Sequence, residues 1–88
     1  MNRNEQLFVQ VLMVFHQSAM MSLGKLKNPA TDKIERNLDQ AREAIEIIEM
    51  LRDKTKGNIS AQESKLLEGI LTELRLNFID ETSKPSIT

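Results

Sequence analysis

The single histidine of this 88-residue sequence could act as an acid or a base near neutral pH. His16 lies beside the apolar face of a predicted helix, and the sequence places no serine, cysteine or acidic orienting residue with it. Nucleophilic and general-base catalysis both need such partners. We therefore interpret His16 as a packed or hydrogen-bonded interface residue, and we predict no catalytic residue.

Three carboxylates could hold a divalent cation. Glu46, Glu49 and Asp53 follow one another at spacings of three and four, so they share one face of a predicted helix. The same spacing is typical of a solvated helix face, and Arg42 and Arg52 lie close enough to form ion pairs with it. Since no second cluster of ligands is present in the sequence, we predict neither a metal site nor a cofactor.

A basic turn at residues 54–58 superficially resembles a phosphate-binding loop. Its sequence is Lys54-Thr55-Lys56-Gly57-Asn58. It leads to a helix N-terminus, where free backbone N–H groups attract anions. However, its order of glycine and Lys-Thr is not that of a Walker motif, and Ser60 and Glu63 can satisfy the helix N-terminus themselves. We expect a turn that ends one helix and begins the next, and we keep binding of a small anion or ligand as the alternative.

The charge balance argues against nucleic acid and membranes as partners. Lys and Arg number 12 against 13 Asp and Glu, so no net field would attract a phosphate backbone or an anionic bilayer. The apolar run at residues 7–15 is too short to cross a bilayer, and it lacks the charge pattern and cleavage site of a secretory signal. The absence of cysteine does not by itself determine the redox compartment, but it fits a cytoplasmic protein, which is the location that we expect.

Residue propensities and turn signals divide the chain into three helices, at about residues 4–23, 32–54 and 60–79. Gly24 and Gly57 can end the first two helices, because glycine readily adopts the left-handed conformation found there. The fold class is therefore all-α. We predict a three-helix antiparallel bundle forming a single domain at residues 4–79, followed by a polar, disordered tail at residues 80–88.

Capping residues place the beginnings of the second and third helices. Thr31 or Asp32 can cap the second helix, with Glu35 placed three residues after Asp32 for a reciprocal hydrogen bond. Ser60 and Glu63 form the corresponding capping box of the third helix.

Apolar residues at helical spacing predict the core faces of the second and third helices. The stripe on the second helix comprises Ile34, Leu38, Ala41, Ile45 and Ile48. The stripe on the third comprises Leu66, Leu67, Ile70, Leu71, Leu74 and Phe78. Gly69 and Leu76 interrupt this third pattern and share one flank. A glycine inside a helix costs about 1 kcal/mol relative to alanine, which close approach of another helix on that flank could offset.

The first helix is apolar around most of its circumference, with Gln6, Gln10 and Gln17 confined to a narrow strip. Two partner helices cannot cover such a helix, so we expect it to complete the bundle by homo-oligomerisation, with a dimer as the default. The predicted interface residues are Phe8, Val11, Leu12, Phe15, Met20 and Met21, together with Gly69 and Leu76. Two alternatives stay open: a flexible first helix that exposes an apolar patch, or a helix that binds a different protein.

Several short motifs occur in a recognisable order along the chain. They are Leu23-Gly24, Asn28-Pro29, Asn37-Leu38 with Ala41, Met50-Leu51, residues 54–58, Glu63 and Glu73-Leu74-Arg75. From about Leu7 to Ile79 the sequence resembles a bacterial family of small helical proteins catalogued as domain of unknown function 1844. The resemblance implies no activity, cofactor or site residue. Glu46 and Thr72 depart from the pattern, which would have Asp and Tyr there.

We expect a homo-oligomeric protein–protein interaction module that binds itself and another protein, and not an enzyme. One His, no Cys and no Tyr leave few catalytic groups, and a domain of this size encloses little concave volume. The alternative is a small regulatory protein that binds an anion or ligand at residues 54–58.

Overall fold

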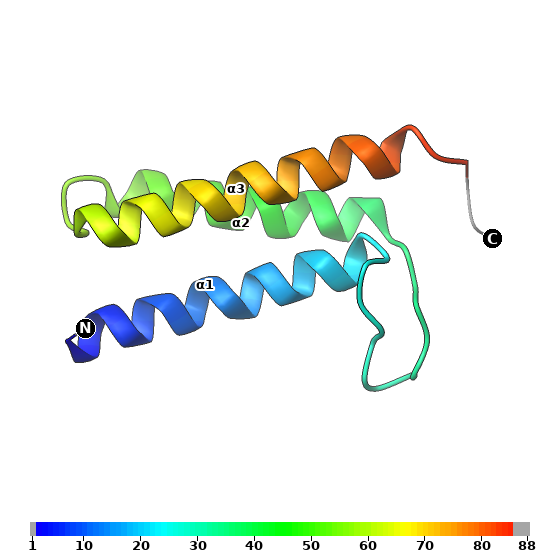
Figure 1. Cartoon of the computed structure of the whole chain (residues 1–88), viewed down its shortest axis with the longest axis horizontal. Helices are drawn as coiled ribbons and strands as arrows, with labels where there is room; N and C mark the ends of the chain where they lie inside the picture. The colour runs from blue at the N-terminus through cyan, green and yellow to red at the C-terminus, as the bar shows by residue number, and fades with distance from the viewer. Residues whose placement is uncertain (1, 86–88) are drawn as a thin grey trace.

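The computed structural model describes residues 2–85 and folds them into three α-helices (Figure 1). They are α1 (Arg3–Ser22), α2 (Leu38–Thr55) and α3 (Ala61–Thr82). In Figure 1 the chain runs from left to right along α1, back along α2 and from left to right again along α3, and each helix contacts both others. The predicted all-α, three-helix architecture is confirmed. Within residues 2–85, no helix is long and apolar enough to cross a membrane.

Short-range capping bonds begin each helix. The Asn2 side chain accepts a hydrogen bond from the Glu5 backbone N–H at 2.8 Å, and Asn37 accepts one from Gln40 at 3.1 Å. At α3 both bonds of the predicted capping box are present, from the Glu63 backbone to Ser60 Oγ and from the Ser60 backbone to Glu63 Oε1. These bonds satisfy N–H groups that would otherwise lack a partner.

The predicted glycines end α1 and α2. Gly24 has a φ of +78° and Gly57 a φ of +84°, a left-handed conformation that strains any residue with a Cβ. The sequence-based assignment of these two helix ends is confirmed.

The prediction that the second helix begins near Thr31 or Asp32 is wrong, because α2 begins at Leu38. Asp32 has a φ of +56°, which is not the extended conformation of an N-cap residue. Residues 23–37 instead form a loop, in which Asn28 donates to Lys33 O at 2.8 Å and Asn37 donates to Ser22 O at 2.8 Å. These cross-loop bonds use backbone groups that a helix would need.

Two side chains near the expected helix start have other roles. The Thr31 hydroxyl donates to Glu35 Oε1 at 2.6 Å, so Glu35 does not form a capping box with Asp32. Ile34, predicted to lie in the core, is 54% exposed. Its apolar periodicity suggested a helix, but the loop carries it away from the bundle.

The C-terminal boundary also differs from the prediction. α3 continues through Asp80 and Glu81 to Thr82, so the predicted disordered tail is wrong for residues 80–82. Glu81 is buried there, held by contacts described below. Residues 83–85 follow the helix, and residues 86–88 of the predicted tail lie outside the described part of the chain.

The core is built from aliphatic side chains of all three helices and from Leu23, the residue directly after α1. Its largest fully buried members are Leu12, Leu23, Ile48, Leu67, Leu71 and Leu74. The predicted apolar stripes of α2 and α3 supply most of this core, apart from Ile34. The Cα atoms extend over 43 × 26 × 16 Å. The molecule is therefore thin in one direction, and much of each helix remains near the surface.

We expect Leu71→Ala to lower the free energy of unfolding by about 2–5 kcal/mol, because a fully buried leucine leaves a cavity when truncated. Urea denaturation followed by circular dichroism measures this loss. The matched variant Ile34→Ala should change stability by less than about 0.5 kcal/mol, since Ile34 is exposed. A large loss in Ile34→Ala would contradict the position of this residue in the loop.

Candidate interaction surfaces

One face of α1 exposes an apolar stripe, which we call the α1 stripe and define as Leu7, Val11 and Val14. These side chains are 41%, 42% and 62% exposed. They follow one another at spacings of four and three, so they lie on one face of the helix. Met13, on a neighbouring flank, is 39% exposed. The helix therefore keeps a band of apolar surface that the other two helices do not cover.

The predicted interface residues of α1 separate into two groups. Leu12 is fully buried in the core of its own chain, so its place in an intermolecular interface is wrong. Phe8, Phe15 and Met20 are partly buried against that core, and Met21 is also partly buried. Of the predicted residues on this helix, Val11 is the most accessible. Leu7 and Val14 were missed, because an almost uniformly apolar helix gives no sequence signal for which side faces its neighbours.

A mixed polar and apolar hollow lies where α1 meets α2, beyond the end of the α1 stripe. Ser18, four residues after Val14, lines this shallow hollow with Phe15 of α1 and with Ala44 and Ile47 of α2. Met50, one helical turn beyond Ile47, is 45% exposed. The lining of this hollow also includes the polar residues Ser22, Gln40 and Glu43, so the hollow separates the α1 stripe from the exposed Met50 by polar surface.

The Gly69 flank of α3 is open. A Cβ built on Gly69 would meet no described atom within 4 Å, so no other helix of the same chain approaches it. The expected close approach that would offset the cost of this glycine is therefore absent within the chain. Gly69 instead lines a surface hollow with other α3 residues, among them Lys65, Leu66 and Glu73. Leu76, on the same flank, is 64% exposed.

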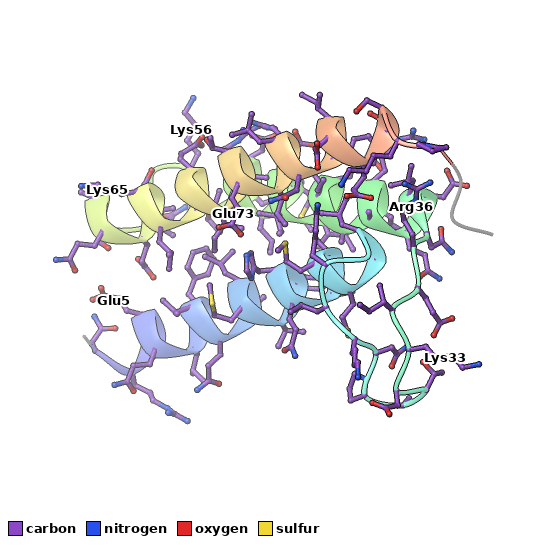
Figure 2. All side chains as sticks on the ribbon, turned by 45° about the vertical axis from the view of Figure 1, so that its right-hand side comes forward. Glu5, Lys33, Arg36, Lys56, Lys65 and Glu73 are labelled. Carbon is purple, nitrogen blue, oxygen red and sulfur yellow. The ribbon has the colours of Figure 1, made fainter. Side chains whose placement is uncertain are left out.

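His16 links α1 to α3. Its Nε2 lies 2.6 Å from Glu73 Oε1, with the histidine side chain 26% exposed and the glutamate 52% exposed. Figure 2 shows Glu73 in the region between the two helices. This contact agrees with the hydrogen-bonded alternative of our interpretation of His16, and the partner is an acidic residue that the sequence could not identify. This contact is an ion pair when the histidine is protonated.

The basic turn at residues 54–58 is largely exposed. Lys56 and Gly57 line a hollow together with Arg52, Ser60 and Ser64, whereas Lys54 and Thr55 do not. Several of these groups already have partners. Arg52 Nε lies 3.1 Å from Asp53 Oδ1, the Thr55 hydroxyl donates to Leu51 O at 2.6 Å, and Ser60 belongs to the capping box.

Two of the three carboxylates considered for metal binding pair with arginines. Glu49 Oε2 accepts from Arg75 Nη2 at 2.6 Å, and Asp53 pairs with Arg52. Across residues 2–85, no group of three or more His, Cys, Asp or Glu side chains is arranged to hold a metal ion.

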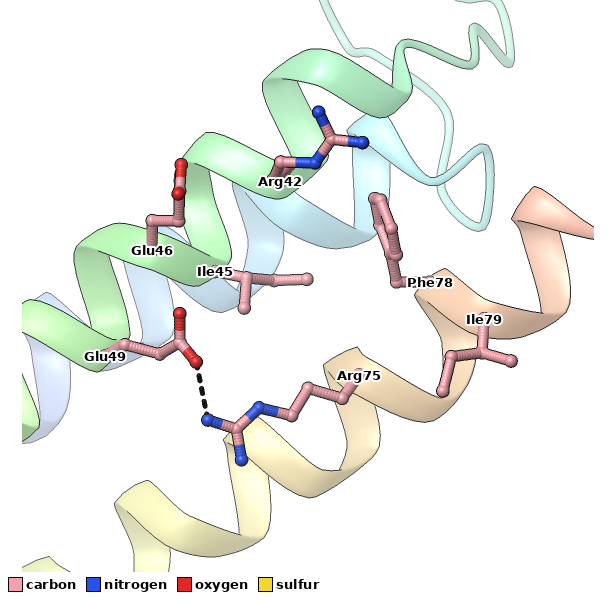
Figure 3. A pocket seen from close by; sticks show the side chains of 7 residues that line it. All are labelled: Arg42, Ile45, Glu46, Glu49, Arg75, Phe78 and Ile79. Carbon is pink, nitrogen blue, oxygen red and sulfur yellow. Dashed lines mark hydrogen bonds and ion pairs between the residues drawn. The ribbon is translucent and has the colours of Figure 1, made fainter.

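A hollow between α2 and α3 was not predicted, because its lining combines residues from two helices. It has a volume of about 340 Å³, with Ile45, Phe78 and Ile79 providing apolar surface (Figure 3). Its charged residues are Arg42, Glu46, Glu49 and Arg75. The Arg42 guanidinium lies 5.6 Å from the centroid of the Phe78 ring, and the Glu49–Arg75 ion pair joins the two helices. Apolar groups flanked by charges of both signs would fit this surface.

A charged cluster at the end of α3 was also missed. It consists of Glu81 with Lys25, Arg36 and Lys84. Glu81 Oε2 lies 2.7 Å from Lys25 Nζ and 2.9 Å from Lys84 Nζ, and its Oε1 lies 3.2 Å from Arg36 Nη1. Arg36 also donates to the backbone oxygens of Glu81 and Pro85. The cluster ties the 23–37 loop to the C-terminal end of α3, where Arg36 is visible in Figure 2.

The environment of Glu81 favours its charged form. Hydrogen bonds from Lys25 and Lys84, and a smaller contribution from Arg36, lower the pKa of the Glu81 carboxyl from 4.5 to about 2, although burial acts in the opposite direction. The Glu81 side chain is 8% exposed, and that of Arg36 is 9% exposed. Since the partners come from the 23–37 loop and from the segment directly after α3, the cluster is a structural anchor.

We expect Glu81→Gln to lower the free energy of unfolding by about 1–3 kcal/mol at pH 7, since charged hydrogen bonds in a buried site are lost. The folded-state pKa of Glu81 lies below its ordinary value, so its contribution is fully present above about pH 4.5 and is lost as the pH falls through about 2. The stabilities of the wild type and Glu81→Gln should therefore converge across this range in urea titrations. The exposed Glu46→Gln variant is the control, and a constant difference between wild type and Glu81→Gln from pH 7 to pH 2 would contradict the prediction.

Comparison with known proteins identifies one family. A family model described as a domain of unknown function (DUF1844) matches residues 5–80. The chain matches no curated protein and no solved structure.

Proposed function

We propose that this chain, which belongs to the family described as a domain of unknown function (DUF1844), acts as a homo-oligomeric protein–protein interaction module without catalytic activity. The observation that carries this proposal is the α1 stripe. The α1 stripe is exposed on one side of the helix, where a second protein can bind and cover it.

The energetics support burial of this surface. Fully burying an exposed large aliphatic side chain contributes about 1.5–3 kcal/mol. The residues of the α1 stripe are 41–62% exposed, so covering each of them contributes a part of that amount. Monomeric proteins seldom expose contiguous apolar patches of this kind. A second copy of the chain is the simplest occupant, because a two-fold axis brings the same apolar stripe from both copies together. The exposed Gln6, Gln10 and Gln17 beside the stripe would form a polar rim.

The non-catalytic role is supported by the contacts of the side chains that could do chemistry, because these side chains pair with other side chains of the same chain. His16 contacts Glu73 across two helices, and Asp53 and Glu49 contact Arg52 and Arg75. These arrangements stabilise helix packing. The chain's lack of cysteine fits the reducing cytoplasm, where we place the module.

We also propose that the module binds another protein, whose identity is open. The hollow between α2 and α3 is lined by residues of these two helices and leaves the α1 stripe free. A partner that presents an apolar side chain between charged groups would complement Phe78 and Ile79 together with Arg42 and Glu46.

We expect Val11→Glu to weaken self-association through α1 by about a hundredfold or more, because the interface would have to bury an unpaired carboxylate. Size-exclusion chromatography with light scattering, over a range of concentrations, measures the change. Gln10→Glu is the matched control: it adds the same charge to the adjacent exposed residue and should have little effect. A wild-type protein that stays monomeric throughout the micromolar range would overturn the proposal.

The alternative function is binding of a small anion by the basic turn. It is favoured by the hollow that Arg52, Lys56, Ser60 and Ser64 line at the N-terminus of α3. The existing partners of Arg52 and Ser60 make it the weaker candidate.

Thermal denaturation with increasing inorganic phosphate separates the two functions. Under the interaction-module proposal, phosphate should shift the melting temperature of the wild type and of Lys54→Ala/Lys56→Ala equally. A phosphate-dependent rise in the wild type that the double variant loses would instead support anion binding, since a ligand stabilises the state that binds it.

A further inference from the structure

We propose that α3 carries a second self-association surface, centred on Gly69, which packs antiparallel against α3 of a second copy across a two-fold axis. We call this surface the Gly69 face and define it as Gln62, Lys65, Gly69, Thr72, Glu73 and Leu76. It is separate from the α1 stripe, and it goes beyond the proposed function by giving a second helix of the same chain an interface of its own.

The Gly69 face is accessible along its whole length. All six of its residues are exposed, and Leu76 is 64% exposed. Their spacing of three or four residues places them on one side of α3. A surface hollow follows this side of the helix, with a volume of about 480 Å³. The hollow is at Gly69, where the helix lacks a side chain.

Gly69 is the feature that the fold of one chain leaves unexplained. It lies inside α3, its φ is not in the left-handed region, and no described atom would meet its Cβ within 4 Å. Neither turn geometry nor packing within the chain therefore requires glycine here. A second helix crossing at this position would require it, because two helix backbones approach most closely where a side chain is absent.

The charges on either side of Gly69 determine the direction of the second helix. Lys65 precedes Gly69 by four residues and Glu73 follows it by four. A two-fold axis at Gly69 with antiparallel helices places Lys65 opposite Glu73 of the partner subunit, and the same pair forms a second time by symmetry. A parallel arrangement would place like charges opposite each other, which is unfavourable.

The remaining residues of the Gly69 face agree with this register. Leu76 falls opposite Gln62 of the partner subunit, whose aliphatic stem and adjacent Leu66 can cover it. The contact of Glu73 with His16 uses Oε1, so Oε2 can accept from a lysine of a second copy. The side chain of Glu73 is 52% exposed, which leaves it accessible for that contact.

Charge reversal tests the register. Each experiment is done in the wild type and in the Val11→Glu background, in which association through the α1 stripe is removed. In this background we expect association to persist.

Lys65→Glu should weaken association in this background by about tenfold, because each new carboxylate faces Glu73 of the partner subunit. Glu73→Lys should weaken it similarly, and the double variant Lys65→Glu/Glu73→Lys should restore it, since reversing both members recreates the pair. Analytical ultracentrifugation measures the dissociation constant of each variant.

Two controls isolate the intermolecular contact. Lys54→Glu makes the same charge change on an exposed lysine of α2 and should leave association unchanged. His16→Gln removes the imidazole contact to Glu73 within the chain, and it should also leave association unchanged. If His16→Gln reproduces the effect of Glu73→Lys, the effect arises inside one chain and the proposal is overturned.

Gly69→Ala distinguishes an intermolecular role of Gly69 from a structural role within one chain, because stability and association should change in opposite directions. The added methyl meets open space within the chain and favours the helix, so the melting temperature of the dissociated chain should rise. The same methyl separates the two helices at their crossing, so association in the Val11→Glu background should weaken by about tenfold. Unchanged association in Gly69→Ala would contradict the proposal.

The outcomes distinguish this proposal from the proposed function. If Val11→Glu is monomeric and Lys65→Glu has no effect in the wild type, association uses α1 alone and the Gly69 face is not an interface. If Val11→Glu associates as the wild type does while Lys65→Glu dissociates it, the α1 interface is wrong and the Gly69 face stands.

Discussion

Two helices can cover only part of the circumference of a third, and this constraint governs α1. Leu12 and Ala19 are buried against α2 and α3, whereas Leu7, Val11 and Val14 remain accessible on another side. The helix carries more apolar surface than its own chain can bury. The exposed stripe is therefore a consequence of having only two partner helices in a thin bundle.

The polar contacts in this protein hold the helices and the loop in register. Glu49 with Arg75 joins α2 to α3, and His16 with Glu73 joins α1 to α3. Such contacts at partly exposed sites contribute little free energy individually, but they favour one alignment of helices over others that the aliphatic core would also accept. The core supplies the driving force, and the ion pairs contribute specificity.

The Glu81 cluster explains why the loop and the last turn of α3 depart from the expectations drawn from the sequence. Arg36 reaches Glu81 from the end of the 23–37 loop, and Lys25 reaches it from the beginning of the same loop. A helix starting at residue 32 would form backbone bonds incompatible with those that close this loop. The same contacts extend α3 beyond Ile79, because an otherwise frayed helix end gains three charged partners for a buried glutamate.

Local chemistry determined the elements that the sequence could predict. The capping box at Ser60 and Glu63, the glycines at the ends of α1 and α2, and the apolar stripes of α2 and α3 all depend on residues within a few positions of one another. The excess apolar character of the first helix is equally a property of the sequence. Only the tertiary structure decided which side of that helix is left exposed, that no helix of the chain approaches Gly69, and that His16 meets Glu73 across 57 residues and Arg36 meets Glu81 across 45. These results depend on how whole helices pack, and packing is set by the combined surfaces of all three helices, which no local pattern encodes.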